Sequence, residues 1–170
     1  MRPIARRAAD TLSPGLAVDL GCGDGTETAW LIDRGWRVVA VDREDEALRR
    51  VTQRTGGRAT VEGTDLADYV PPAADLVLAC AALPFIPPHH FNDAWARIRG
   101  AVRPGGILAV ELFGDRDSWT TDPSMTFHSR DDVDAMTVGA DVLSLTEVEF
   151  DGPSGRGPKH WHRFELIARC

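Results

Sequence analysis

Residues 16–26 of the chain, with the sequence LAVDLGCGDGT, join a short apolar run to three glycines at alternate positions. An apolar run of this length that ends in glycines is typical of a buried strand. The segment that begins at Thr26 has apolar residues at 29–32 and is expected to form a helix. Glycines let the backbone approach a ligand closely, and a helix start offers unpaired amide donors. The stretch therefore predicts a strand, a tight loop and a helix that together form one wall of a ligand site.

The spacing of the glycines disfavours one common ligand. A dinucleotide-binding loop has glycines at about offsets 0, 2 and 5, whereas here, counted from Gly21, they lie at offsets 0, 2 and 4, with Thr26 at offset 5. Asp19, near the end of the strand, would repel a pyrophosphate and suits a cationic ligand. Asp42 ends a second apolar run, where a carboxylate can accept hydrogen bonds from both hydroxyls of a ribose.

Composition and charge limit the class of protein. The 170 residues are 43% hydrophobic and contain no run of about 18 apolar residues, so we expect one domain over 1–170 and no membrane span. The net charge of −7 and the lack of a basic face disfavour a nucleic-acid partner. Three scattered cysteines do not form a disulfide framework, so the reducing cytoplasm is the expected location. We expect a monomer or homodimer that acts on a small molecule.

The apolar pattern predicts alternating strands and helices along the chain. Strands are expected at 16–21, 36–41, 58–62, 74–80, 107–113, 141–150 and 160–168, and helices at 3–13, 26–34, 44–54, 89–99 and 129–138. Turns are expected at 103–106 and 152–158, which contain glycine and proline.

This order of elements predicts the fold class. Alternation of strands and helices indicates an α/β protein, a Rossmann-like three-layer sandwich whose sheet is covered on both faces. No helix separates the last two expected strands, so these form an antiparallel hairpin. The prediction is a seven-stranded, mostly parallel sheet with an antiparallel last strand.

The motifs, taken in order, resemble the class I S-adenosylmethionine-dependent methyltransferases. The resemblance rests on the glycine loop with Asp19 and Asp42, on Gly63–Leu66 after the third expected strand, on 75–81 and on 103–106. It implies that Asp65 accepts the adenine amino group, that the amide of Leu66 reaches the ring, and that the end of the fourth strand lies beside the methionine part of the cofactor. The implied cofactor-binding residues are Asp19, Gly21, Cys22, Gly23, Gly25, Thr26, Asp42, Arg43, Thr64, Asp65, Leu66, Cys80 and Ala81.

Four later segments resemble a small bacterial branch of that family described as tellurite-resistance-like: 83–85, 113–119, 125–128 and 159–162. The branch implies direct in-line methyl transfer to a small acceptor, with S-adenosylhomocysteine as the product. The fourth strand ends in AALPF and so lacks the Asn or Asp, Pro, Pro, aromatic motif of amide and adenine amino methyltransferases. Two other functions stay open, namely a nicotinamide-dependent reductase and a non-catalytic cofactor-binding module.

All five histidines fall in segments expected at the carboxyl edge of the sheet, where ligands of such sheets bind. We expect His128 and His160 to orient the acceptor or take its proton, and Phe85, Trp119 and His162 to contact it. A structural hydrogen-bonding role for His160 or His162 is an equal alternative. These two histidines share one strand face, but without a well-spaced third ligand no metal is predicted. Lys159 is expected to attract an anionic acceptor. The pocket is expected to be open, or to be covered by a lid formed by the loop from Gly114 to Ser129 or by a second subunit.

Overall fold

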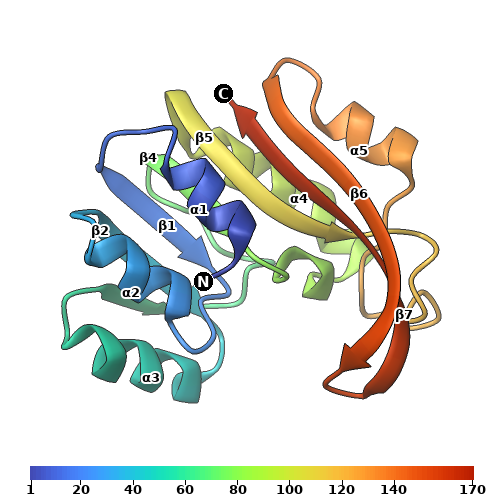
Figure 1. Cartoon of the computed structure of the whole chain (residues 1–170), viewed down its shortest axis with the longest axis horizontal. Coiled ribbons are helices and arrows are strands. Elements are labelled where there is room, and N and C mark those ends of the chain that lie inside the picture. Colours follow the sequence, from blue (N-terminus) through green and yellow to red (C-terminus); the bar gives the residue numbers. More distant parts are fainter.

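The computed structural model describes all 170 residues and contains a single sheet of seven strands with helices on both sides (Figure 1). The strands are β1 (Leu16–Leu20), β2 (Arg37–Asp42), β3 (Thr60–Gly63), β4 (Ala74–Ala79), β5 (Val102–Phe113), β6 (Asp141–Ser154) and β7 (Gly157–Arg169). The helices are α1 (Pro3–Ala9), α2 (Thr26–Ile32), α3 (Asp45–Thr55), α4 (Pro88–Gly100) and α5 (Arg130–Met136), with a short 3₁₀ helix η1 (Leu83–Phe85).

The strand order across the sheet is β3-β2-β1-β4-β5-β7-β6. Strands β1 to β5 pair in parallel, and β7 lies between β5 and β6 and is antiparallel to both. The predicted fold class, including the antiparallel last strand, is confirmed. The carboxyl ends of β1, β2 and β4 meet at the edge where the chain crosses between the two halves of the sheet, which is where ligands bind in open α/β sheets.

Each face of the sheet buries its own apolar cluster. Helices α1 and α2 cover one face, with Ile4, Ala8 and Leu31 packed on alternate residues of β1, β4 and β5. Helices α4 and α5 cover the other face, with Phe91, Ile98 and Val133 in a cluster of 21 buried residues. The strands are apolar on both sides because neither face of the sheet is left to water there.

The structure corrects both predicted turns. Residues 103–106 belong to β5, because Val102 already pairs with Ala74 and a register shift between Ala74 and Leu76 absorbs the irregular segment. Residues 152–154 and 157–158 belong to the last two strands, which stay in register out to the pair Ser154 and Gly157. The strand pairs skip residues 103–106, where Gly105 has φ of +80°, and the predicted turn at 152–158 is confined to residues 155–156.

Some predicted ends also differ. Helix α1 ends at Ala9 rather than near residue 13, and the hydroxyl of Thr11 donates to the carbonyl of Ala8, in place of another helical turn. Helix α5 ends at Met136, and η1 was not predicted at all.

The β6–β7 hairpin projects beyond the end of β5 (Figure 1). Along β7, pairing with β5 begins only at Arg163, which lies opposite Phe113. Residues 157–162 therefore pair only with β6 within the sheet. The chain that leaves β5 runs along this extension. Gly114 donates from its backbone amide to the carbonyl of His162 at 2.7 Å, and Ser118 donates to that of His160 at 3.0 Å. None of the helices has both the length and the apolar character needed to cross a membrane.

Candidate active site

Two adjoining cavities lie at the carboxyl ends of β1, β2 and β4, and Gly21 lines both of them. The first has a volume of about 300 Å³ and lies against Asp42, Asp65 and Phe85. The second, of about 380 Å³, lies against Asp19, Gly23 and Cys80. Because they share the glycine loop, the two cavities form one elongated site that is divided at Gly21.

The glycine loop takes a backbone conformation that side chains disfavour. Gly21 has φ of +68°, and a Cβ there would lie 2.3 Å from the Cβ of Ala82. Gly23 has φ of +52°, and nothing but the carbonyl oxygen of Gly21 lies within 4 Å of the place of a Cβ. Gly21 is therefore required by packing, while Gly23 keeps the second cavity free of a side chain.

Asp42 ends β2 and connects it to the glycine loop. Its Oδ2 accepts a hydrogen bond from the amide of Gly23 at 3.0 Å, and its Oδ1 accepts one from the amide of Glu44 at 3.1 Å. Each carboxylate oxygen has a second lone pair, so the carboxylate can still accept from a ligand in the first cavity. Asp65, across that cavity, accepts from the amide of Ala67 at 2.9 Å and lies 3.6 Å from the guanidinium of Arg43.

Asp19 is a buried carboxylate in the wall of the second cavity. Only 2% of its surface is exposed, and its Oδ2 accepts a hydrogen bond from the hydroxyl of Thr28 at 2.6 Å. Burial raises the pKa of Asp19 to about 7, against the effect of that hydrogen bond. Burial, with Asp19 nearby, likewise raises the pKa of the thiols of Cys22 and Cys80, so neither cysteine is a thiolate nucleophile at neutral pH.

Ala81 is the only residue other than glycine with a positive φ, at 57°. It lies two residues after the end of β4 at Ala79 and lines the first cavity. A left-handed alanine costs on the order of 1–3 kcal/mol, and such strain clusters at ligand sites. The left-handed conformation of Ala81 lets the chain turn sharply from β4 into η1, and this turn brings Phe85 to the cavity wall.

All but one of the thirteen predicted cofactor-binding residues line these two cavities. The exception is Gly25, which precedes α2 with φ of +75° and packs on Val51. The sequence did not point to several other lining residues: Arg2, Asp24, Glu27, Glu44, Ala82 and Ile86. Arg2 stands out among them because its backbone amide donates to Glu27 at 2.7 Å and its guanidinium donates to Glu111 at 2.8 Å. No motif marks it, since it precedes the first predicted strand by a whole helix.

His128 lies outside both cavities. Its ring packs on Phe91 of α4, with ring centres 4.6 Å apart, and only 7% of the residue is exposed. Burial lowers the pKa of His128, and its buried Nε2 has no hydrogen-bond partner. The ring is therefore neutral at pH 7 and part of the packing beneath the loop.

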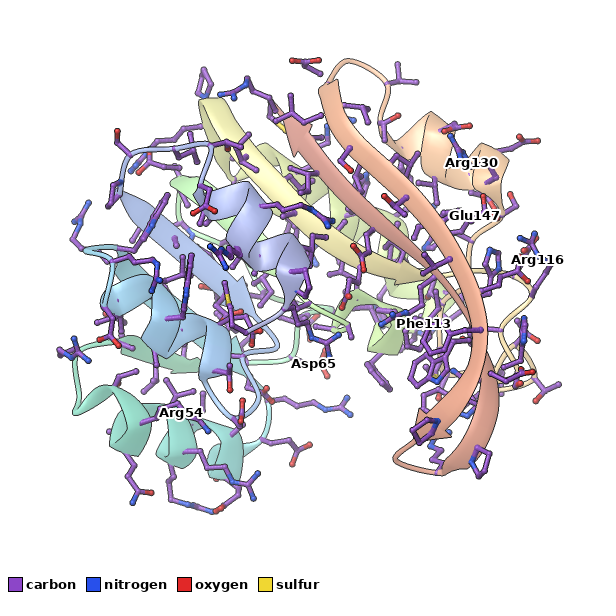
Figure 2. All side chains as sticks on the ribbon, viewed as in Figure 1. Arg54, Asp65, Phe113, Arg116, Arg130 and Glu147 are labelled. Carbon is purple, nitrogen blue, oxygen red and sulfur yellow. The ribbon has the colours of Figure 1, made fainter.

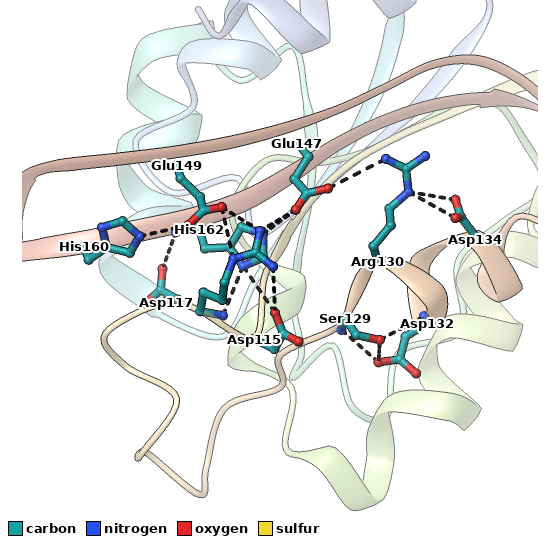
Figure 3. Close-up of polar contacts among 11 residues, drawn as sticks. Asp115, Asp117, Ser129, Arg130, Asp132, Asp134, Glu147, Glu149, His160 and His162 are labelled. Carbon is teal, nitrogen blue, oxygen red and sulfur yellow. Dashed lines mark hydrogen bonds and ion pairs between the residues drawn. The ribbon is translucent and has the colours of Figure 1, made fainter.

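His160 and His162 lie on one face of the hairpin, as predicted, among carboxylates (Figure 3). The ring of His160 is bonded to Asp151 at 2.8 Å and Glu149 at 3.2 Å, and these bonds raise its pKa. The fully buried ring of His162 accepts from the amide of Arg116 at 3.1 Å and lies 3.0 Å from Glu147. Neither ring lines either of the two cavities.

Two carboxylates, those of Glu147 and Glu149, lie beside His162, and the sequence analysis did not predict this. Glu147, Glu149 and His162 offer ligand atoms within 4.8 Å of one another. The guanidinium of Arg116 already lies at this point, with its Nη2 2.6 Å from both glutamates. These hydrogen bonds lower the pKa of Glu149 to about 2, so the cluster is a compensated ion-pair network.

The remaining predicted substrate residues belong to a group of rings next to the first cavity. Phe85 lines the cavity, and its ring centre lies 6.3 Å from that of Phe113. We define the aromatic cluster as Phe113 together with the five rings joined to it directly or through Trp161, namely Phe85, Trp119, Phe127, Phe150 and Trp161. Figure 2 shows Phe113 between the hairpin and the rest of the sheet.

Lys159 lies inside the aromatic cluster. Its ammonium is 3.6 Å from the ring centre of Trp119 and 3.9 Å from that of Trp161, and it forms an ion pair with the buried carboxylate of Asp117. Asp117 also accepts from the amides of Trp119 and His162. The charge of Lys159 is thus neutralised inside the protein rather than offered to an anionic acceptor.

The loop from Gly114 to Ser129 is fastened on two sides. Besides its bonds to β7, Thr126 donates from its amide to Pro84 at 2.9 Å and from its hydroxyl to Ile86 at 2.6 Å. The loop therefore connects the hairpin to η1 and forms a fixed wall beside the site.

Comparison with known proteins gives a family match. The model of the family described as "Methyltransferase domain" matches residues 17–106. A trans-aconitate 2-methyltransferase of Rhodopseudomonas palustris (strain BisB18) is 36% identical over 105 residues, which are 58% of this chain and 39% of that protein. One from Variovorax paradoxus (strain S110) is 36% identical over 107 residues, or 61% and 40% of the two chains. The chain thus spans about two fifths of the length of these curated relatives.

Solved structures share the fold over nearly the whole chain. TehB from Haemophilus influenzae superposes with a TM-score of 0.87 at 15% identity, covering 99% of this chain and 62% of that one. The N-methyltransferase NodS from Bradyrhizobium japonicum WM9, solved with S-adenosylhomocysteine, superposes with a TM-score of 0.73 at 18% identity, covering 96% and 83%.

Proposed function

The chain belongs to the family of methyltransferase domains, and we propose that it binds S-adenosylmethionine and transfers the methyl group to a small-molecule acceptor. The observation that carries the proposal is the divided site at Gly21, with Asp42 and Asp65 on one side and Asp19 on the other. Carboxylates at both ends match a cofactor with a ribose, a neutral adenine and a cationic methionine part, and without phosphate.

The residues of the two cavities fit this cofactor. Asp42 would accept hydrogen bonds from the ribose hydroxyls, while Asp65 and the amide of Leu66 would hold the adenine. Asp19 and Glu27 give the second cavity the negative charge that an ammonium group requires.

The same charges disfavour a nicotinamide dinucleotide. Three acidic residues line the second cavity, Asp19, Asp24 and Glu27, against one basic residue, Arg2. A pyrophosphate at the start of α2 would face this net negative charge. The reductase alternative therefore has no support in the electrostatics of the site.

When bound, S-adenosylmethionine supplies a methyl group on a sulfonium, so an acceptor lone pair forms the new bond while the carbon–sulfur electrons return to sulfur. The protein's part is to hold the acceptor in line and exclude water. No histidine lines the cavities, so a proton of the acceptor would leave to solvent. Catalytic roles for His128 and His160 stay predictions, which the variants below test.

The setting of the reaction is also a proposal. The relatives and neighbours named above carry the names of trans-aconitate and N-methyltransferases, which supports a small acceptor. The net charge of −7 supports the absence of a nucleic-acid partner, and three free cysteines support a reducing cytoplasm. A monomer or homodimer fits a site whose lining comes from one chain.

Calorimetric titration tests the proposal directly. We expect S-adenosylhomocysteine to bind with a stoichiometry of one and NADH not to bind. A radiolabelled methyl donor should then label a member of a panel of carboxylic acids, amines, thiols, phenols and chalcogen oxyanions. Binding of NADH alone would overturn the proposal, and cofactor binding without transfer to any acceptor would favour a non-catalytic module.

A further inference from the structure

Three charged side chains connect the second cavity to the aromatic cluster. Glu111 of β5 is 2% exposed, and its Oε2 accepts a hydrogen bond from the guanidinium of Arg2 at 2.8 Å. Its other oxygen, Oε1, lies 3.7 Å from the guanidinium of Arg163 of β7. One carboxylate between two guanidinium groups leaves a net positive charge of one at this place.

Arg163 is the less satisfied of the two arginines. It lies opposite Phe113 in the β5–β7 ladder, so the two side chains share a face of the sheet. The guanidinium carbon lies 5.2 Å from the ring centre of Phe150 and 5.6 Å from that of Trp161. Its buried Nε has no hydrogen-bond partner, and its side chain is 19% exposed. A buried donor without an acceptor is costly unless a ligand supplies one.

The aromatic cluster, which meets Arg163 at Phe150 and Trp161, forms a surface rather than a closed core. Phe150 is 42% exposed and Phe85 is 41% exposed, while Trp119 and Trp161 are half-buried. The ammonium of Lys159 lies over both indoles, whose ring centres are 5.8 Å apart, and stabilises their arrangement. Exposed aromatic rings that are fixed in this way bind flat molecules without a large loss of side-chain entropy.

This surface is continuous with the cofactor site at two points. Arg2 lines the second cavity, and Phe85 lines the first cavity and contacts Phe113. Arg2 and Phe85 thus belong to the walls of the site that Gly21 divides. An acceptor on the aromatic cluster would therefore adjoin the site proposed for the cofactor.

We propose that the acceptor is a small planar anion, whose carboxylate or similar group binds Arg163 and Arg2 and whose flat part lies on Trp161 and Phe150. The proposal rests on the proposed function, because it assigns the acceptor of that same site. Glu111 acts as a positioning residue that holds the two arginines. The anion would neutralise the net charge of the three side chains and give the Nε of Arg163 an acceptor.

The test uses three matched probes on the protein saturated with S-adenosylhomocysteine. These are 2-naphthoate (planar and anionic), decahydro-2-naphthoate (anionic but not planar) and 2-naphthamide (planar but neutral). Calorimetry or ligand-observed NMR should show that 2-naphthoate binds at least tenfold more tightly than either of the others.

Two variants locate the binding. Arg163→Gln should weaken 2-naphthoate at least tenfold while the affinity for 2-naphthamide stays within twofold, and Arg163→Lys should restore part of the loss. Arg156→Gln is the matched control. Arg156 lies at the exposed tip of the hairpin, over Trp119, and its guanidinium pairs with Asp122 of the loop after β5. It should change neither affinity. Trp161→Leu should weaken both planar probes.

The outcomes separate this proposal from the one it rests on. If S-adenosylhomocysteine does not bind, the proposed function fails. If it binds but 2-naphthoate shows no preference over the other two probes, or if Arg163→Gln has no more effect than Arg156→Gln, the planar-anion proposal is overturned and the proposed function stands. Thermal unfolding of each variant shows that it is folded before it is titrated.

Discussion

The carboxylate of Asp42 accepts a hydrogen bond at 3.0 Å from the backbone amide of Gly23, so the end of β2 fixes the middle of the glycine loop. One side chain thus shapes the loop and, in the proposed function, binds the ribose. Variants of Asp42 report on both tasks and require a measurement of folding alongside a measurement of binding.

Asp42→Ala should weaken S-adenosylhomocysteine binding by about 1–3 kcal/mol, or roughly 5- to 150-fold, because a charged acceptor of two hydroxyls is lost. Asp42→Asn keeps one acceptor oxygen and should lose less. Titration calorimetry measures the affinities, and thermal unfolding checks the fold. An unchanged affinity for a folded Asp42→Ala protein would remove this residue from the site.

Gly23→Val should abolish cofactor binding, because the side chain would enter the space that Gly23 leaves free in the second cavity. Gly57→Val is the matched control, since Gly57 also has a positive φ, +75°, with nothing within 4 Å of a Cβ, and lines neither cavity. Both variants carry similar backbone strain, so only the first should lose binding. Equal affinities in the two would refute the place of the loop in the site.

Asp19 should make cofactor affinity depend on pH. Its pKa of about 7 means that the free protein at pH 6 holds a neutral carboxyl, whereas an ammonium group is best bound by the carboxylate. Affinity for S-adenosylhomocysteine should therefore rise as the pH increases from 6 to 8, and Asp19→Asn should flatten this rise. If the affinity of Asp19→Asn rose with pH as much as that of the parent, the pH dependence would come from another group.

The same carboxyl should affect stability with the opposite sign. Its pKa in the folded protein is raised above the unfolded value of about 4, so the folded state binds more protons between pH 4 and 7. The contribution of Asp19 to the free energy of unfolding of the free protein should fall as the pH rises through that range. Urea unfolding of the parent and of Asp19→Asn, compared across these pH values, measures the contribution.

His160→Ala should leave S-adenosylhomocysteine affinity and methyl transfer within about twofold of the parent, because its ring is bonded to Glu149 and Asp151 and lines neither cavity. His128→Leu, which fills a similar volume beside Phe91, should behave likewise. A fall in methyl transfer of tenfold or more at unchanged cofactor affinity would instead support the roles predicted from the sequence, since loss of a general base costs roughly 10²-fold or more.

Lys159→Met should lower the free energy of unfolding by about 3–5 kcal/mol, because it leaves the buried carboxylate of Asp117 without its counter-charge. The double variant Lys159→Met with Asp117→Asn should recover part of this loss. Urea unfolding of the parent, of Lys159→Met, of Asp117→Asn and of the double variant forms a complete double-mutant cycle. A double variant no more stable than Lys159→Met would show that the ion pair does not carry the effect.

The sequence predicts the part of the site that local spacing controls. The strand, the glycine loop and Asp42 are close together along the chain, so apolar runs and glycine positions fix their arrangement. Ala81 directly follows one predicted strand and Asp65 lies three residues after another, and parallel strands bring those ends to one edge. The fold class follows from the same alternation of elements.

The other side of the site depends on contacts that no local pattern carries. The histidines were placed at the correct edge, but which way a side chain points depends on strand register. His160 and His162 share a face with Glu147 and Glu149, whereas the intervening Trp161 lies on the face of Phe113. Arg2 joins Glu111 across 109 positions of the chain, a pairing that only the packing of α1 on β5 creates.

The fastened loop between Gly114 and Ser129 has a kinetic consequence. Its bonds to β7 and η1 are already formed in the free protein, so the wall that carries Trp119 and Phe127 exists before any ligand arrives. A ligand that enters there does not have to order a loop, and its association rate is set by diffusion and charge rather than by a slow conformational step. Selectivity among acceptors must then come from their residence times, so good and poor acceptors will differ in their dissociation rates.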